Sequence, residues 1–126
     1  MFKISEDKTI HLTRGDVANI TVSASTSDGA YTFKVGDVVR LKVFKRKDCS
    51  IVMLQKDIEV TEETQAVDIF LNSEDTKFGE LISKPKNYWY EVELNPNTMP
   101  QTIIGYDEEG EKLFVLYPEG SDVEWT

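Results

Sequence analysis

Apolar and polar residues alternate over long stretches of this chain. The longest example is YWYEVEL, residues 88–94, in which Tyr88, Tyr90, Val92 and Leu94 occupy every second position. Successive side chains of a strand point to opposite faces of its sheet, so this period places the four side chains on one face. The stretch therefore predicts a strand with one buried and one solvated face.

The same alternation predicts strands elsewhere in the chain. The clear candidates are Ala18–Ala24, Val39–Val43, Val67–Leu71 and Leu113–Tyr117, and the weaker ones are Thr9–Thr13, Ile51–Gln55, Ile58–Val60 and Gln101–Tyr106. In the closing strand we assign Leu113, Val115 and Tyr117 to the inward face, because they share one parity.

Turn-forming residues separate the predicted strands. Asp107–Gly110 predicts a four-residue hairpin loop between the last two strands, with Gly110 at positive φ, and Pro118–Gly120 ends the last strand. One helical turn is expected at Ser73–Phe78, capped by Asn72 or Ser73 and stopped by Gly79.

Short strands joined by turns, with almost no helix, predict an all-β fold. We expect an immunoglobulin-like β-sandwich of about seven to nine antiparallel strands with one short helical turn. The length of 126 residues suits one domain, 1–126, whose core lies at about residues 9–120.

Composition and charge exclude several classes of protein. The net charge of −9 repels phosphate backbones, so nucleic acid is not an expected partner. Cys49 is the only cysteine and cannot form an internal disulfide. Met1–Thr9 lacks an apolar signal-peptide core, and no apolar run approaches ~18 residues. We therefore expect neither export by an ordinary signal peptide nor insertion into a membrane.

Arg14-Gly15-Asp16 is the tripeptide that many adhesion ligands present to integrins. Recognition of that kind needs an exposed loop tip, but here the apolar positions keep the same parity from Ile10 to Val22. This continuity predicts one extended segment bent at Gly15, where the chain passes from one sheet to the other. Arg14 and Asp16 are then expected to pair across the bend.

Several stretches also carry a family resemblance when they are taken in order. They are TRGD at 13–16, DVVRLKVFK at 37–45, VDIFLNSEDT at 67–76, YWYEVEL at 88–94 and GEKLFVLYPEG at 110–120. This series is similar to the N-terminal domain of phage baseplate upper proteins, which occur in the tail tips of phages and prophages of Gram-positive hosts.

The resemblance implies an immunoglobulin-like sandwich that docks onto the tail or baseplate of a virion and is assembled in the cytoplasm of the host bacterium. Its implied partners are other tail proteins, as a homo-oligomer or a hetero-assembly. Family members usually continue into a linker and a distal domain and carry receptor-binding proteins, whereas this sequence stops at Trp125-Thr126. No functional residue carries over, because the shared motifs resemble scaffold.

Metal chemistry has few candidate ligands. With one histidine, His11, and one thiol, Cys49, a zinc site would need carboxylates to complete it. His11 has the outward parity of its strand and is expected to be solvated. Four acidic residues crowd one predicted hairpin and could form a weak calcium site: Asp107, Glu108, Glu109 and Glu111. The simpler interpretation is a charged hairpin tip that keeps the protein soluble. We expect no cofactor.

Catalytic signatures are also lacking in the sequence. There is no Gly-x-Ser-x-Gly elbow and no Cys-His signature, so His11 would act as a base only if the fold brought a nucleophile to it. A carboxylate pair for glycoside hydrolysis stays open among 23 acidic residues, but a domain this small rarely holds both a sugar cleft and a core. We expect a protein that is not an enzyme.

Large apolar residues occur at positions expected to face water. They are Trp89, Phe70, Phe114, Phe44 and Ile104. Either the chain's own segments cover them, or they form a subunit interface, or they stack on a glycan. We predict a docking module that buries the face around Trp89. The alternative is a carbohydrate-binding or adhesin-type surface sandwich in which Trp89 or Tyr106 stacks on a sugar ring.

Overall fold

The strands predicted from the alternation form a β-sandwich. The structure, a computed structural model, describes residues 1–119. Its strands are β1 (Phe2–Ile4), β2 (Ile10–Thr13), β3 (Ala18–Val22), β4 (Ser25–Thr26), β5 (Gly29–Ala30), β6 (Val38–Phe44), β7 (Val52–Glu59), β8 (Val67–Leu71), β9 (Lys86–Leu94), β10 (Gln101–Ile104) and β11 (Leu113–Tyr117). The one helical element of residues 1–119 is the 3-10 turn η1 (Asp75–Lys77). The predicted fold class, an all-β sandwich with one short helical turn, is confirmed; the expectations for Gly120 and for Trp125-Thr126 lie outside the described residues.

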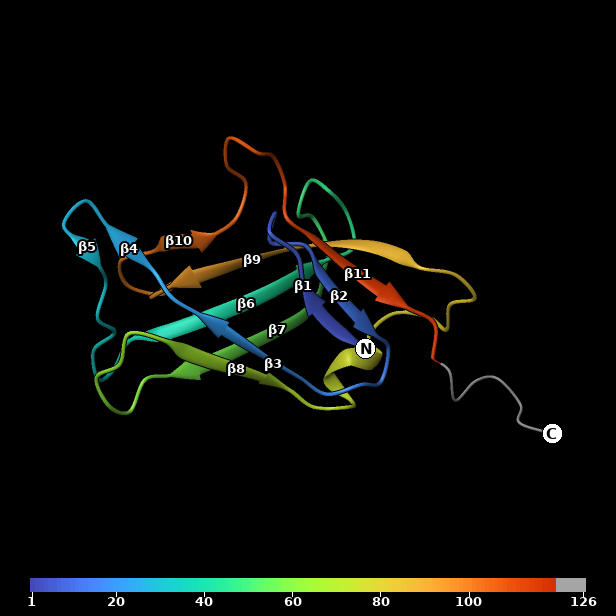
Figure 1. The fold of residues 1–126 in the computed structure, drawn as a ribbon, viewed down its shortest axis with the longest axis horizontal. Coiled ribbons are helices and arrows are strands. Elements are labelled where there is room, and N and C mark those ends of the chain that lie inside the picture. Colours follow the sequence, from blue (N-terminus) through green and yellow to red (C-terminus); the bar gives the residue numbers. More distant parts are fainter. Residues whose placement is uncertain (120–126) are drawn as a thin grey trace.

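Most strands belong to one seven-stranded sheet. Its order is β1-β2-β11-β9-β6-β7, and β10 also pairs with β9. All of these pairs are antiparallel except β2–β11, which is parallel and differs from the antiparallel arrangement predicted. β3 and β8 form a separate two-stranded sheet, and β4 and β5 form a short hairpin at one end of the molecule (Figure 1).

A single hydrophobic cluster joins the two sheets. Ile20 of β3 and Ile69 of β8 belong to the same cluster as Leu41 of β6 and Val92 of β9, and each of these side chains is at most 2% exposed. Alternate residues are buried in β2, β3, β6, β8 and β9. The inward faces predicted for these strands are therefore confirmed.

β11 is the strand whose predicted faces are wrong. Phe114 and Leu116 are 0% exposed, whereas Leu113 is only partly buried. Phe114 pairs with Ile10 on one side and Tyr88 on the other, and both partners lie in the core. All five residues of β11 are hydrophobic, so alternation cannot select its inward parity, and the pairing with β2 and β9 decides it.

The predicted hairpin between the last two strands is also wrong. Asp107 and Gly110 do form a tight turn, closed by two backbone hydrogen bonds, with Gly110 at φ +98°. The strands on either side of this loop do not pair with each other, because β10 and β11 each pair with a different part of β9. The loop between them therefore protrudes from the sheet (Figure 1).

The remaining differences concern the ends of strands. The two weak candidates at Ile51–Gln55 and Ile58–Val60 are one continuous strand, β7. Phe2–Ile4 forms β1 on β2, outside the predicted core of residues 9–120. The expected helical turn is present at η1, but its N-cap residue is Glu74, which makes no side-chain capping hydrogen bond, and not Asn72 or Ser73 as predicted. Asn72 Oδ1 does accept a hydrogen bond from the Asp75 backbone N–H.

Candidate functional site

Trp89 lies on the outer face of the larger sheet, in a row of apolar side chains that crosses four strands. It pairs with Phe44 of β6 and with Leu113 of β11, and Phe44 also pairs with Val52 of β7. Residues opposite each other on neighbouring strands share a face. We name Val52, Phe44, Trp89 and Leu113 the Trp89 row.

The Trp89 row is covered in its middle and open at one end. Phe44 is 3% exposed, Trp89 and Leu113 are partly buried, and Val52 is 47% exposed. A small pocket of about 60 Å³ lies beside Trp89, lined in part by the loop that follows β6 and the loop that follows β10. Tyr106, at the rim of that pocket, is 80% exposed. The chain's own loops therefore cover only part of this surface.

The indole N–H of Trp89 has no partner within residues 1–119. Its Nε1 is shielded from solvent and makes no hydrogen bond. Leaving a buried donor unpaired costs about 1–3 kcal/mol, so such groups are uncommon in folded proteins. On the same strand, burial raises the pKa of Glu91, and the nearby charge of Glu93 raises it further. The region around Trp89 thus contains an unsatisfied donor that is shielded from solvent and a poorly solvated carboxylate.

Beyond the Trp89 row, the outer face of β6, β7 and β9 carries pairs of opposite charge. Arg40 on β6 donates two hydrogen bonds to the carboxylate of Asp57 on β7, at 2.8 and 2.9 Å. Lys42 Nζ on β6 lies 3.7 Å from Glu93 Oε1 on β9. The Arg40 hydrogen bond holds the pKa of Asp57 below its usual value, although burial opposes the shift. The apolar Trp89 row therefore adjoins rows of paired charges.

Two of the five predicted interface residues, Phe114 and Phe44, are buried, and a third, Ile104, is partly buried and faces the core. Phe114 is in the core, because its pairing partners on β2 and β9, Ile10 and Tyr88, face inward. Phe44 has the outward parity expected, but it is 3% exposed between its neighbours in the row. A β-bulge between Thr102 and Ile104 pairs Ile104 with Val92, and Ile104 packs against the core cluster. These three placements are corrections to the sequence prediction.

Phe70 is exposed as predicted, but on the other sheet. Its side chain is 52% exposed and it pairs with Asn19. The outer face of β3 and β8 also carries Thr21, whose hydroxyl donates to Asp68 at 2.7 Å. A single exposed apolar residue among polar ones is ordinary for a protein surface.

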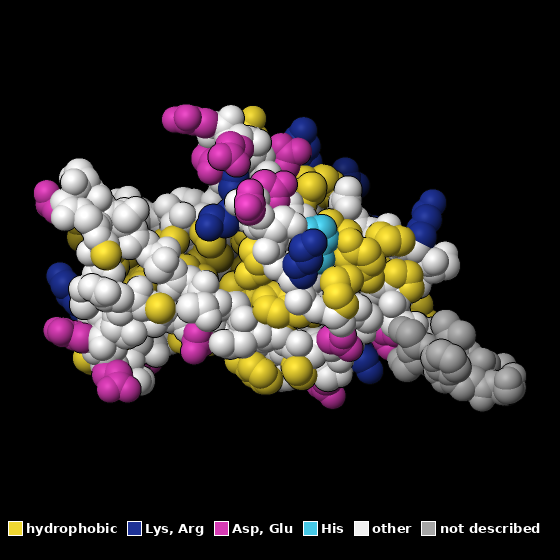
Figure 2. All heavy atoms as spheres, viewed as in Figure 1, with side chains coloured by type: hydrophobic (Ala, Val, Ile, Leu, Met, Phe, Trp, Pro, Cys, Tyr) yellow, Lys and Arg dark blue, Asp and Glu magenta, His cyan; other side chains and the backbone are white. Residues whose placement is uncertain are grey.

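Two acidic residues of the loop after β10 pair with lysines. Lys112 is 4% exposed and its Nζ lies 2.7 Å from Asp107 Oδ1, while Lys47 Nζ lies 3.4 Å from Glu111 Oε1. The Lys112 hydrogen bond lowers the pKa of Asp107. Within residues 1–119 no group of three or more His, Cys, Asp or Glu side chains could hold a metal ion, and Figure 2 shows the acidic side chains spread over this protruding loop. The structure thus gives no support to the calcium hypothesis for Asp107, Glu108, Glu109 and Glu111.

His11 is more constrained than the sequence predicts. Its Nε2 lies 2.8 Å from Ser5 Oγ and its Nδ1 lies 2.9 Å from Tyr117 Oη, both within hydrogen-bond distance. Figure 2 shows the histidine between a basic side chain and a group of hydrophobic side chains. The fold does bring a hydroxyl to His11, but the third group is a tyrosine hydroxyl and not the carboxylate that orients the histidine in a Ser-His-Asp triad. Neither Ser5 nor His11 lines the pocket beside Trp89, the pocket bordered by Gly15 and Ser73, or the pocket bordered by Tyr31 and Gln101.

The Arg-Gly-Asp segment is where the chain leaves the larger sheet, as predicted. β2 before it belongs to that sheet and β3 after it belongs to the smaller one. Gly15 has φ +89°, a conformation that glycine adopts readily. Thr76 of η1 is 0% exposed; its hydroxyl accepts the Gly15 N–H at 3.0 Å and donates to the Asp16 carbonyl at 2.8 Å.

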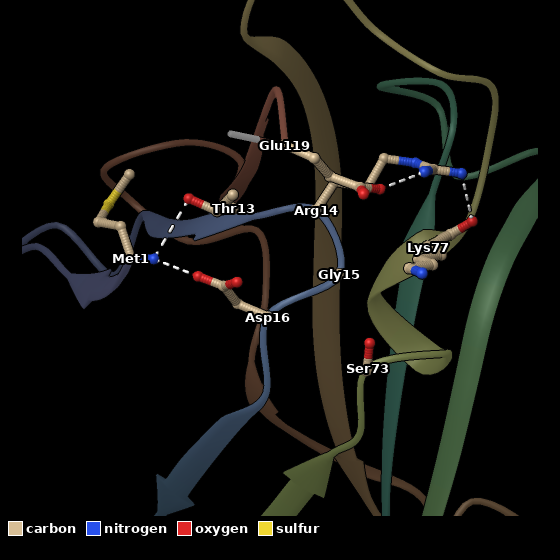
Figure 3. A pocket seen from close by; sticks show the side chains of 8 residues that line it. All are labelled: Met1, Thr13, Arg14, Gly15, Asp16, Ser73, Lys77 and Glu119. Carbon is tan, nitrogen blue, oxygen red and sulfur yellow. Dashed lines mark hydrogen bonds and ion pairs between the residues drawn. The ribbon is translucent and has the colours of Figure 1, made fainter. Parts of the chain in front are cut away.

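Arg14 and Asp16 do not pair with each other, so that part of the prediction is wrong. Arg14 pairs with Glu119 and donates to the Lys77 carbonyl at 2.9 Å, while Asp16 pairs with the amino group of Met1 (Figure 3). The Arg14 side chain is 10% exposed. These residues border an open pocket of about 530 Å³. Because Arg14 is held by its own chain, the tripeptide is not presented as an adhesive loop tip.

Comparison with protein-family models, with curated proteins and with solved structures finds no match. Within residues 1–119 no helix is long and apolar enough to cross a membrane.

Proposed function

We propose that this domain is a non-enzymatic docking module of a phage or prophage tail baseplate, and that the open part of the Trp89 row, with Tyr106, forms its contact surface. The observation that carries the proposal is the exposed apolar surface at the open end of the row and beside Trp89, where Val52 is 47% exposed and Tyr106 is 80% exposed. Tryptophan and tyrosine are enriched where proteins bind one another. The baseplate setting is supported by the resemblance of the strand sequences to baseplate upper proteins.

Covering this surface would release a useful amount of free energy. Tyr106 is 80% exposed, and a buried aromatic side chain removes roughly 150–250 Å² from water. The exposed part corresponds to about 120–200 Å², or about 3–5 kcal/mol at ~25 cal/mol per Å². The loss of translational and rotational freedom on association offsets part of this gain, so neighbouring contacts are needed too.

The test is assembly with tail proteins, using two matched valine substitutions. Val52 is 47% exposed in the Trp89 row, and Val35 is 67% exposed before the opposite end of β6, roughly 20 Å away for a strand of this length. Light scattering should show an oligomer, or pull-down from a lysogen extract should recover baseplate or distal-tail proteins identified by mass spectrometry. Val52→Glu should weaken that assembly about tenfold or more, because it buries a charge, whereas Val35→Glu should not.

Two results would count against the proposal. One is a strictly monomeric protein that recovers no tail protein. The other is equal assembly by both valine variants, which would place the contact away from the Trp89 row.

A further inference from the structure

A second pocket lies between β10 and the chain around β4. It has a volume of about 320 Å³, and its wall includes Ser23–Thr26, Tyr31, Leu94 and Gln101–Ile103. None of the residues that line it is charged, although charged residues make up 29% of the chain. Leu94 lies five residues beyond Trp89 on β9, so this pocket is separate from the Trp89 row.

Unpaired polar side chains line this pocket. Ser23, Ser25, Gln101 and Thr102 contribute three hydroxyls and one amide, and none of these groups has a hydrogen-bond partner within residues 1–119. Hydroxyls and amides both donate and accept hydrogen bonds. The pocket therefore offers several uncharged donors and acceptors to a ligand.

Tyr31 adds an aromatic ring in a fixed position. Its hydroxyl donates to Asp37 Oδ2 at 2.8 Å, and its ring meets Phe33 edge to face, with centroids 5.2 Å apart. Leu94, which is 8% exposed, and Ile103 supply apolar surface. Small-molecule sites combine such apolar and aromatic walls with a few placed polar groups, and their volumes start at about 300 Å³.

We propose that this pocket binds a neutral saccharide, as one ring or a disaccharide. A sugar ring has an apolar C–H face that packs on an aromatic ring and hydroxyls that exchange hydrogen bonds with serine, threonine and glutamine side chains. The pocket supplies both kinds of group and no charge, so a neutral ligand fits and an ionised one meets no counter-charge. This site is independent of the docking role proposed for the Trp89 row.

An extended peptide is the other ligand to consider, because it could pair with the free edge of β10 as an added strand. β10 pairs only with β9, so its second edge is unpaired within the described residues. That edge has four residues and is interrupted by the bulge between Thr102 and Ile104. Bulges disrupt the regular ladder that an added strand needs. The geometry therefore favours a compact ligand over strand addition.

The experiment is a titration of the full chain, followed by amide chemical shifts in NMR spectra. The probes are glucose, galactose, mannose, N-acetylglucosamine and their disaccharides, with glucuronate and N-acetylneuraminate as charged comparisons. We expect at least one neutral sugar to bind saturably, with a dissociation constant of about 1 mM or lower, and to shift amides of Gln101–Ile103 and Ser23–Thr26. Gln101→Ala should weaken binding about tenfold, the usual consequence of losing a ligand hydrogen bond. Gln65→Ala, an exposed glutamine in the loop before β8, should leave binding unchanged.

Several outcomes would overturn this proposal. They are no saturable shift with any neutral sugar, equal affinity for the charged sugars, and binding that is insensitive to Gln101→Ala. Loss of binding on Tyr106→Ala, with Gln101→Ala unaffected, would move the sugar to the Trp89 surface. Shifts caused by a strand-forming peptide and not by sugars would show that β10 is a peptide-binding edge.

Discussion

Replacing Thr76 by valine tests whether the Arg-Gly-Asp segment is a structural crossing. Valine has nearly the shape of threonine, so the change removes the hydroxyl and leaves the packing almost intact. That hydroxyl accepts the Gly15 N–H at 3.0 Å and donates to the Asp16 carbonyl at 2.8 Å. The substitution therefore leaves one backbone donor and one backbone acceptor without their partner.

The expected cost follows from these two groups. An unsatisfied buried polar group costs about 1–3 kcal/mol. Gly15 and Asp16 are only partly buried, so water can reach part of each group, and the expected loss of unfolding free energy is about 2 kcal/mol in total. Thr76→Ser is the matched control, because it keeps the hydroxyl and loses one methyl group, for about 1 kcal/mol.

Urea unfolding followed by tryptophan fluorescence would measure both variants, provided that the transitions are two-state and have equal slopes. The reasoning would be refuted if Thr76→Val were as stable as Thr76→Ser or more stable. That result would mean that packing, and not the two hydrogen bonds, holds η1 to the sheet crossing.

The other predictions concern β11 and the charged outer face. Leu116→Ala should lower the unfolding free energy by about 2–5 kcal/mol, because Leu116 is 0% exposed, and Leu113→Ala by clearly less; similar losses in urea unfolding would contradict the observed faces of β11. Asp57→Asn should cost at most about 1 kcal/mol at pH 7, since the pair with Arg40 is partly exposed. The pKa of Asp57 is lowered by Arg40, so its contribution is present above the usual value of 3.8 and is lost as the pH falls through the lower folded value. The stability difference between wild type and Asp57→Asn should accordingly vanish in acid, and a difference that persisted unchanged at pH 2 would disprove the assignment.

The parity of a residue in a strand predicts the face of the sheet on which its side chain lies, but not whether that face is exposed. Parity places Trp89 on the outer face, and the structure agrees, because its neighbours Tyr88 and Tyr90 are buried on the inner face. Parity could not reveal that the loops after β6 and β10 cover part of that face, because loop positions depend on the whole fold. The bulge at β10 reversed the face of Ile104 in the same way, since one extra residue shifts every later side chain.

The residues that line the second pocket are far apart in the sequence. Tyr31 and Gln101 lie 70 residues apart, and nothing in their local patterns connects them. They line one pocket because β10 pairs with the end of β9 and the chain after β3 passes beside it. The hydrogen bond from Tyr31 to Asp37 could not be predicted from composition either.

The sequence alone determined the fold class and the inward faces of β2, β3, β6, β8 and β9, as well as the bend at Gly15. These features depend on the local alternation of side chains and on the freedom of glycine, so they are encoded within a few residues. The tertiary structure decided the faces of β11, the partners of Arg14 and Asp16, the covering of the Trp89 row and the pocket beside β10. Each of these depends on which distant strands pair and where loops come to lie, and long-range packing settles both.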